Sequence, residues 1–487
     1  MKNNFNRIIL KYKSMPIQVK ASFWFLICSF LQKGIVVITT PIFTRIMTTH
    51  EYGQFGVFNS WMSMISTFVT LNLYAGMYTR GLVKYKSQKK EFSSSLQSLV
   101  FCMTVFWIVV YYIFQDAINK YTSLTTPQTL CMLVLIWTTS VYNFWAAEQR
   151  VELHYKSLVV LTLLISILKP TLGIILVKYA QDKVTARIVS LVVVETVFFS
   201  WCFVSQMRKG RKIFVRQFWK EAFLFNVPLI PHYLSMSILN GADKIMIERM
   251  VGSSESGIYN LAYQISQVML LFNSALIQTI EPWLYKKIND GETDDIKNIA
   301  YPSWLFIAVM NLLLICFAPE IVRLFAPSEY IQAIWVIPPI AMSVFFIFQY
   351  AFFAVFEFYY TKTKLAAVAT CTGALLNILL NYIFIGKYGY YAAGYTTLFC
   401  YIIYAVMHYL FMRRIVREES YENNVYSFKT MFIMAIGFLT SGFIIMLTYN
   451  NLIIRYLLII IGALTVLYKR KKIAEFVRKI MLVRKSK

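Results

Sequence analysis

Two lysines lie in the middle of long apolar segments, where a positive charge is costly. Lys33 falls about twelve residues into the run 21–45, roughly 18 Å along a helix and near the centre of a ~30 Å hydrocarbon layer. Lys169 has a similar depth in the run 157–177, and Pro170 removes one backbone donor beside it. A basic residue at this depth costs roughly 2.5 to 3.5 kcal/mol on insertion scales, so we expect both lysines to face a wet interior.

An ammonium group at the membrane midplane has two uses, and the sequence leaves both open. An unpaired lysine would bind an anionic headgroup, for which a pyrophosphate is the obvious candidate. Alternatively, each lysine pairs with an intramembrane acid such as Glu195 and only holds helices together. Arg45 and Arg249, at the outer ends of their spans, are further substrate-binding candidates, although arginine near a helix end also serves as an interface anchor or cap.

Acids within the apolar runs are candidates for coupling transport to a proton or sodium gradient. Glu195 lies mid-span, and Asp243 lies in a neighbouring span directly before Lys244, so a local surface pairing is its alternative role. Pro228 and Pro231 stand three residues apart in the same span as Asp243. Because each breaks the backbone ladder, they are hinge candidates.

The chain shows no pattern of catalytic, metal-ligating or cofactor-binding residues. The four histidines, at positions 50, 154, 232 and 408, have no metal-ligand spacing, and the seven cysteines form no C-x-x-C pair. There is no Gly-rich nucleotide loop of the P-loop type. The connections between apolar runs are also too short for a soluble catalytic domain, so we expect a protein that is not an enzyme and needs no cofactor or metal.

Composition places the elements that carry these residues in a bilayer. A hydrophobic share of 58% with a mean hydropathy of +0.57 over 487 residues exceeds what a soluble core can bury. The apolar runs have helical length, which predicts an all-α integral membrane protein with about fourteen transmembrane helices. The expected spans are 21–45, 54–75, 94–114, 128–147, 157–177, 186–206, 223–246, 257–284, 300–318, 331–360, 364–384, 390–411, 429–448 and 452–468.

The net charge of +25 does not indicate nucleic-acid binding, because the basic residues follow the membrane topology. Most of the Lys and Arg residues lie in segments on one side of the expected spans, which is the positive-inside pattern of a cytoplasmic face. An even number of spans then places both termini in the cytoplasm.

One short motif occurs twice. The segment Arg45–Phe55, RIMTTHEYGQF, recurs without a gap as Arg249–Tyr259, RMVGSSESGIY, and each copy joins one apolar run to the next. We therefore expect two related halves, with the two copies forming matching corners on the outer face.

Four segments resemble polysaccharide transporters of the Wzx type: Pro41–Phe55, Ala242–Ile265, Pro319–Tyr330 and Leu375–Gly394. These segments lie at the expected relative places, and the resemblance covers almost the whole chain. The resemblance implies the fold of the multidrug/oligosaccharidyl-lipid/polysaccharide exporter superfamily, with two six-helix bundles around a central cavity and two additional C-terminal helices. On this basis we divide the chain into a cytoplasmic N-terminus (1–20), an N-terminal bundle (21–206), a cytoplasmic linker (207–222), a C-terminal bundle (223–412), two additional helices (413–468) and a basic cytoplasmic tail (469–487).

The same resemblance implies a flippase of a bacterial inner membrane. Such a protein moves polyprenyl-pyrophosphate-linked oligosaccharides to the outer leaflet by alternating access, for O-antigen, capsule or exopolysaccharide assembly. We expect it to be a monomer in contact with membrane lipids, acting beside other polysaccharide-assembly proteins. The alternatives are a multidrug exporter or a peptidoglycan-precursor flippase on the same fold, or a membrane polysaccharide polymerase or ligase, which the short external loops disfavour.

Overall fold

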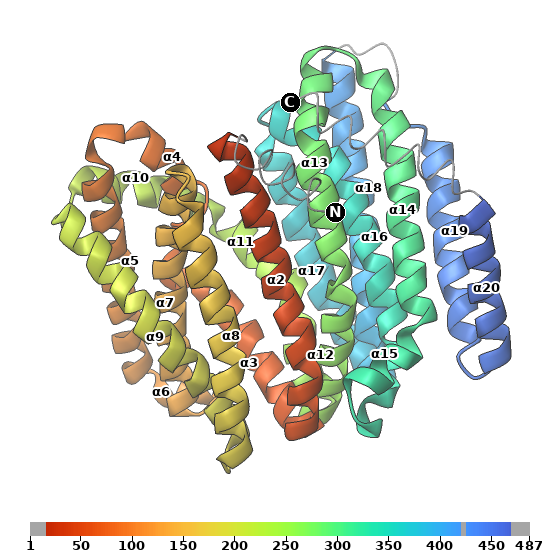
Figure 1. Ribbon diagram of the computed structural model, residues 1–487, viewed down its shortest axis with the longest axis horizontal. Helices are drawn as coiled ribbons and strands as arrows, with labels where there is room; N and C mark the ends of the chain where they lie inside the picture. The colour runs from red at the N-terminus through yellow and green to blue at the C-terminus, as the bar shows by residue number, and fades with distance from the viewer. Residues whose placement is uncertain (1–15, 420–424, 469–487) are drawn as a thin grey trace, which may run out of the picture. The chain divides into compact units, whose positions relative to one another are not determined.

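The computed structural model describes residues 16–419 and 425–468, and every regular element within these ranges is helical (Figure 1). Eleven of the described helices are long and apolar enough to cross a membrane. The prediction of an all-α, multi-pass membrane protein is therefore confirmed. The basic tail and most of the expected cytoplasmic N-terminus lie outside the described residues.

The predicted number of about fourteen spans is not confirmed, because several helices in the expected places are too polar or too short. Helix α3 (Thr49–Thr70) carries polar residues along its length. The expected span 257–284 is two helices, α12 (Ser253–Gln267) and α13 (Met269–Asn289), which meet at Val268. Within α20 (Leu452–Tyr468), the apolar stretch runs only to Gly462 among the described residues.

The chain forms two compact units. Unit 1 contains the described residues up to Met47 together with Val57–Ser237, and unit 2 contains Thr48–Gly56 and the described residues from Ile238 onward. The boundary at Ser237 falls inside a helix, beyond the loop 207–222 that the sequence suggested as the linker.

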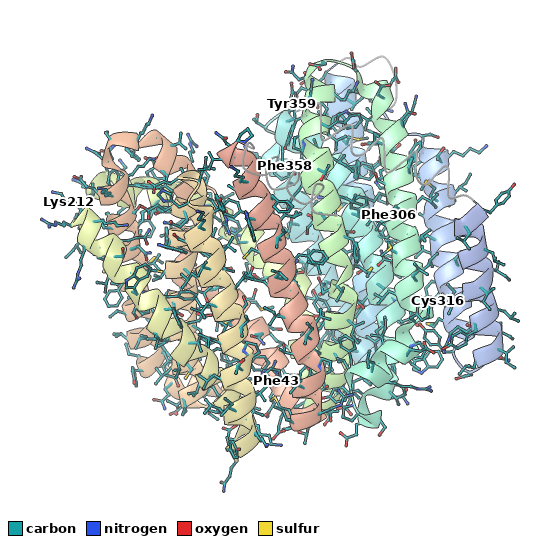
Figure 2. All side chains as sticks on the ribbon, viewed as in Figure 1. Phe43, Lys212, Phe306, Cys316, Phe358 and Tyr359 are labelled. Carbon is teal, nitrogen blue, oxygen red and sulfur yellow. The ribbon has the colours of Figure 1, made fainter. Side chains whose placement is uncertain are left out.

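Unit 1 is a bundle whose centre is the packing of α7 and α8 against α9, while α2 packs on α8 and α5 packs on α9 (Figure 1). Phe43 of α2, labelled in Figure 2, lies against Gly173 of α8 and under the Arg187 guanidinium, 3.9 Å from its ring centroid. The helices of this unit are α2 (Ile17–Ile46), most of α3, α4 (Met77–Lys84), α5 (Lys89–Ile113), α6 (Gln115–Thr122), α7 (Thr126–Val151), α8 (Tyr155–Tyr179), α9 (Lys183–Gly210), α10 (Arg216–Asn226) and the start of α11 (Ile230–Met250).

Two features fix the ends of the helices that matter for the site. Thr125 caps α7 through a capping box with Gln128, and Asp182 caps α9 by accepting a hydrogen bond from the Thr185 backbone N–H at 2.9 Å. The caps fix the residues at which α7 and α9 begin, and the two helices pack against each other through their inner faces. Those faces pack through a cluster of apolar side chains that includes Val141, Trp145, Leu158, Val194 and Phe199.

Unit 2 is built around α16, which is buried along nearly its whole length and packs against α12, α13, α14 and α18. Helix α17 packs on α18, and α19 packs on α14 and α16. Besides the start of α3, the rest of α11, and α12, α13 and α20, its helices are α14 (Ile296–Cys316), α15 (Ala318–Phe325), α16 (Ile337–Tyr359), α17 (Thr363–Tyr388), α18 (Tyr391–Glu418) and α19 (Phe428–Leu447).

The last described helix is tied to unit 2 by a buried ion pair. Arg455 of α20 is 2% exposed and its guanidinium donates to the Glu320 carboxylate of α15. Tyr449, which precedes α20, donates from its hydroxyl to the Ile315 carbonyl at 2.7 Å. These polar contacts hold a helix whose other side chains are largely exposed.

The matched glycines of the two motif copies lie close together within unit 2. A Cβ atom on Gly53 would lie 1.9 Å from the Ser253 carbonyl oxygen, and a Cβ on Gly257 would lie 2.0 Å from the Thr49 carbonyl oxygen. The matched glycines therefore allow the first turns of α3 and α12 to touch backbone to backbone. The relation is reciprocal, which explains why glycine stands at the same position of both copies.

The expected break at the proline pair is present in the backbone. Helix α10 ends at Asn226, a single 3₁₀ turn spans Val227–Leu229, and α11 begins at Ile230 with Pro231 in its first turn. Pro228 sits inside the 3₁₀ turn, where its missing N–H leaves no bond unmade. Whether this break serves as the hinge stays a prediction.

Candidate functional site

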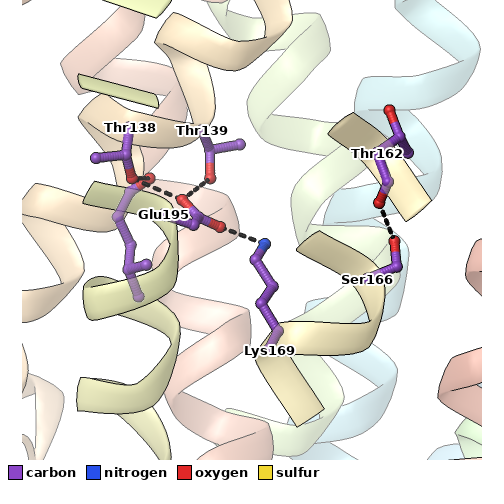
Figure 3. Close-up of polar contacts among 7 residues, drawn as sticks. Thr138, Thr139, Thr162, Ser166, Lys169 and Glu195 are labelled. Carbon is purple, nitrogen blue, oxygen red and sulfur yellow. Dashed lines mark hydrogen bonds and ion pairs between the residues drawn. The ribbon is translucent and has the colours of Figure 1, made fainter. Parts of the chain in front are cut away.

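The most prominent polar feature of the membrane helices in unit 1 is the ion pair between Lys169 and Glu195 (Figure 3). The Lys169 ammonium of α8 donates to the Glu195 carboxylate of α9 at 2.5 Å. The Glu195 side chain is 6% exposed, whereas that of Lys169 is 28% exposed. The pairing alternative left open by the sequence is therefore the arrangement that the structure shows.

The second oxygen of Glu195 is held by the neighbouring helix. Thr138 and Thr139 of α7 both donate from their hydroxyls to Oε2 of Glu195, at 2.6 Å and 3.0 Å. One carboxylate thus accepts three hydrogen bonds from two helices, one of them from a cation. Because a buried charge is tolerated only when it is paired and hydrogen-bonded, this network explains how Glu195 stays in the membrane interior.

A cavity of about 200 Å³ adjoins the pair in unit 1. The polar part of its wall carries amides, hydroxyls and the ion pair, and the apolar part is formed by Ile165 and two aromatic rings. Tyr142 and Phe199 stack with their ring centroids 4.8 Å apart, and the Tyr142 hydroxyl is 2.5 Å from that of Thr162. The lining residues are Gln32, Thr139, Tyr142, Asn143, Thr162, Ile165, Ser166, Lys169, Glu195 and Phe199.

This wall suits a ligand with many hydroxyl groups. Amide and hydroxyl side chains donate and accept hydrogen bonds in the same place, and the ring faces offer a flat apolar surface. The ion pair adds a strong donor and a strong acceptor without a net charge. These groups are suited to polar recognition of a ligand through hydrogen bonds.

Lys33 is not part of this cavity wall. It is exposed on α2, and none of the described residues forms an ion pair or hydrogen bond with it. Its neighbour Gln32 does line the cavity, and successive residues of a helix point about 100° apart. The structure therefore does not bring Lys33 and Lys169 together in one cationic chamber, and their roles as substrate-binding residues stay predictions.

The two arginines of the repeated motif lie at matching helix ends. Arg45 is exposed in the last turn of α2 and donates from Nη1 to the Pro41 carbonyl at 2.8 Å. Arg249 is exposed in the last turn of α11. A positive charge at a helix C-terminus is favourable for the helix dipole, so the capping role fits both positions. Substrate binding by Arg45 and Arg249 stays untested.

Asp243 is far more buried than a surface pairing would require. It is 1% exposed, and its carboxylate accepts the Tyr259 hydroxyl and, at 3.1 Å, the Lys244 backbone N–H. The Lys244 ammonium lies 4.0 Å from the Tyr263 ring centroid. Asp243 thus sits in a satisfied polar site of unit 2, and its role in ion coupling, like that of Glu195, stays a prediction.

The acidic loop after α13 is an ordinary charged surface. Lys287 bonds to Asp295 at 2.8 Å and also to Glu292, and these carboxylates raise the pKa of the Lys287 ammonium above its usual range. Within residues 16–419 and 425–468, no group of three or more His, Cys, Asp or Glu side chains is placed to hold a metal ion.

Sequence reasoning missed most of the cavity wall. Gln32, Thr139, Asn143 and Ser166 are polar residues inside apolar runs, and that polarity is the signal that could have marked them. Polar residues in membrane helices usually face the bundle interior. Without the packing of α7, α8 and α9, however, nothing in the sequence shows which of the many such residues share one wall.

Comparison with known proteins connects this geometry to a family. A family model described as polysaccharide biosynthesis protein matches residues 19–288, more than half of the chain. The chain belongs to the polysaccharide biosynthesis protein family. A second model, described as MatE, matches residues 228–383. Both matches agree with the resemblance to the exporter superfamily that the sequence motifs suggested.

Individual relatives are distant. The chain is 22% identical over 483 residues to a probable low-salt glycan biosynthesis flippase, Agl15, of Haloferax volcanii, covering 95% of this chain and 99% of that protein. It is 21% identical over 207 residues to the Lsg locus putative protein 1 of Haemophilus influenzae, covering 41% of this chain and 52% of that protein. The chain thus spans about half the length of that relative.

Solved structures show the same fold. The lipid II flippase MurJ in an inward closed conformation matches with a TM-score of 0.68 at 15% identity, covering 92% of this chain and 99% of the other. An inward-facing multidrug resistance MATE family transporter matches with a TM-score of 0.60 at 13% identity, covering 80% and 96%. This family member therefore has the fold that MurJ and the MATE transporters share.

Proposed function

We propose that this family member is a flippase for lipid-linked oligosaccharides. It moves polyprenyl-pyrophosphate-linked repeat units from the cytoplasmic to the outer leaflet of a bacterial inner membrane, for O-antigen, capsule or exopolysaccharide assembly. The family match and the name of the Haloferax relative support the glycan part of this proposal. The fold shared with MurJ and the MATE transporters supports the transport part.

The observation that carries the proposal is the hydrogen-bonding cavity beside Lys169 and Glu195. Both residues lie on helices long enough to span a membrane. Placing polar groups there is costly, and in membrane proteins such groups mark substrate or ion pathways. A cavity rich in hydroxyls and amides, with stacked rings, fits sugar units better than it fits a bare lipid chain.

The ion pair refines the roles that charge alone suggested. Because Glu195 neutralises Lys169, the cavity favours the neutral sugar portion of the headgroup over the pyrophosphate. Lys33 forms no ion pair with any described residue, and in the sequence it follows Gln32 of the cavity wall. We assign the phosphate contact to Lys33, since an uncompensated ammonium gains most from a phosphate oxygen.

Transport by alternating access requires the ligand or a coupling ion to bind two conformations differently. The break at Pro228 between α10 and α11 supplies a place where the backbone is free to bend without losing a ladder hydrogen bond. The polyprenyl tail would stay in the lipid while the headgroup is moved.

The proposal is tested by deleting the gene and restoring it as variants. Lys33→Ala and Lys169→Ala should each leave lipid-linked repeat units facing the cytoplasm and remove most of the surface glycan, when glycan is measured per amount of protein in the membrane. Lys178→Ala, an exposed change at the end of α8, serves as the control and should export normally. Normal glycan output from the double variant of Lys33 and Lys169 would remove both residues from the mechanism.

One observation favours a second candidate, a multidrug exporter. The cavity presents a carboxylate and two aromatic rings, which also suit a hydrophobic cation, and the MatE model matches part of the chain. Drug efflux from cells separates the two functions. An exporter of cations would lower drug accumulation and would leave the lipid-linked intermediates unchanged when it is deleted.

A further inference from the structure

A second buried acid and base lie in unit 2, far along the chain from the sugar cavity. Glu357 of α16 is 0% exposed and His408 of α18 is 1% exposed. Nδ1 of His408 lies 2.6 Å from Oε1 of Glu357. The remaining polar atoms, Oε2 of Glu357 and Nε2 of His408, have no hydrogen-bond partner among the described residues.

The walls around this pair are aromatic. The Tyr350 ring of α16 stacks on the His408 ring at 5.1 Å, and the Tyr404 ring of α18 meets it edge-on at 4.5 Å. Thr370 of α17 lies 3.3 Å from the Tyr404 hydroxyl. These rings close the pair off from water on the sides that they cover.

No further charge compensates the pair. Among the described residues, His408 is the ionisable partner in contact with the Glu357 carboxylate, and the Tyr404 phenol is a further titratable group that interacts with it. Another ion pair lies at the ends of α17 and α18, where the Lys362 ammonium is 3.2 Å from the Glu418 carboxylate. Lys362 contacts Glu357 through its backbone, donating its N–H to the Glu357 carbonyl.

The charge of the pair follows from this isolation. With one proton between them, the carboxyl and the imidazole have no net charge, either as two neutral groups or as an ion pair. Removing that proton leaves an anion in an apolar enclosure, which is costly. When water reaches the pair the anion is solvated, and the cost falls. Proton release and opening of this part of unit 2 are therefore linked.

We propose that Glu357 and His408 form a proton-binding site that couples the conformational change of unit 2 to a proton gradient. The inference rests on the proposed transport function and assigns its coupling ion. The site binds one proton while it is enclosed and releases it to the side from which water enters. The atoms without partners, Oε2 of Glu357 and Nε2 of His408, are where that water donates and accepts hydrogen bonds.

Amide hydrogen exchange of the reconstituted protein tests this linkage without any substrate. If opening releases one proton, the equilibrium constant for opening of α16 and α18 rises about tenfold per pH unit above the midpoint of proton release from the opened pair. The measurement covers about pH 5 to 8. The double variant E357Q/H408Q keeps side chains of similar size and polarity but does not titrate. The wild-type to variant ratio of exchange rates should therefore grow with pH in α16 and α18 and stay constant in α7 and α9.

A matched variant and a second measurement distinguish loss of the proton site from a change in helix packing. The exchanged pair E357H/H408E keeps one acid and one base in contact and should restore the pH dependence, while E292Q, an exposed change, should not alter it. Infrared difference spectra between the two ends of the pH range should show a carboxyl signal that E357Q removes. A constant exchange ratio, or a carboxyl signal that survives in E357Q, would overturn the proton site. Either result would leave the flippase proposal standing, because that proposal is tested by glycan export.

Discussion

The Lys169–Glu195 pair predicts an asymmetric response to the removal of each partner. In K169M, the Glu195 carboxylate keeps only the two threonine hydroxyls and is left as a buried charge, because its side chain is 6% exposed. Breaking a buried pair in this way lowers the free energy of unfolding by about 3–5 kcal/mol. Because the Lys169 side chain is 28% exposed, we expect a loss of about 3 kcal/mol, at the lower end of this range. In E195M, the Lys169 ammonium loses its partner but is 28% exposed, so we expect a smaller loss of about 1–2 kcal/mol.

The double variant K169M/E195M completes the cycle. Replacing a buried pair by apolar side chains of similar volume is often neutral, so its free energy of unfolding should return to within about 1 kcal/mol of the wild type. The coupling energy of the cycle would then be about 2 kcal/mol or more. The assay is equilibrium unfolding in mixed micelles, followed by circular dichroism. A coupling energy below about 0.5 kcal/mol would refute the ion pair as the feature that joins α8 and α9.

Two further predictions concern the packing of unit 2. G53A and G257A each place a Cβ about 2 Å from a carbonyl oxygen and should cost roughly 1–3 kcal/mol, seen as a lower midpoint of thermal unfolding in detergent, whereas G34A, with no atom within 4 Å, should not lower it. Equal midpoints for G53A and G34A would contradict the reciprocal contact of α3 and α12. R455L leaves Glu320 without its buried partner and should make the chain between α19 and α20 more sensitive to limited proteolysis, while R455L/E320L should recover most of the resistance. Unchanged proteolysis of R455L would show that other contacts hold α20.

The sequence predicted the helical membrane fold and the duplicated corner because both depend on local patterns. Apolar runs of helical length specify membrane helices whatever surrounds them. The repeat around Gly53 and Gly257 was visible as two similar strings, but their mutual contact was not, since it depends on how α3 and α12 cross. The count of about fourteen spans is not confirmed where polar residues in α3 and α12 make these helices less apolar than their length suggests.

The candidate site was predicted only in part, for a related reason. Lys169 and Glu195 were conspicuous as charges in apolar runs, yet both pairing and substrate binding were consistent with their positions. The packing of α8 on α9 brings the Lys169 and Glu195 side chains into contact. Gln32 of α2 lines the cavity, whereas the next residue, Lys33, does not. The contact between His408 and Glu357 was not predicted, because the two residues lie far apart in the sequence and meet only where α16 packs on α18.

The central claim, that the cavity beside Lys169 and Glu195 serves transport and not stability alone, is tested most directly by glycan export in cells that carry K169M/E195M. This variant should fold and reach normal levels, because the buried charges are removed together. We predict that it nevertheless accumulates lipid-linked repeat units and displays little surface glycan. Wild-type glycan display by this double variant would show that the pair only joins helices, and would contradict the account of the cavity as the sugar site.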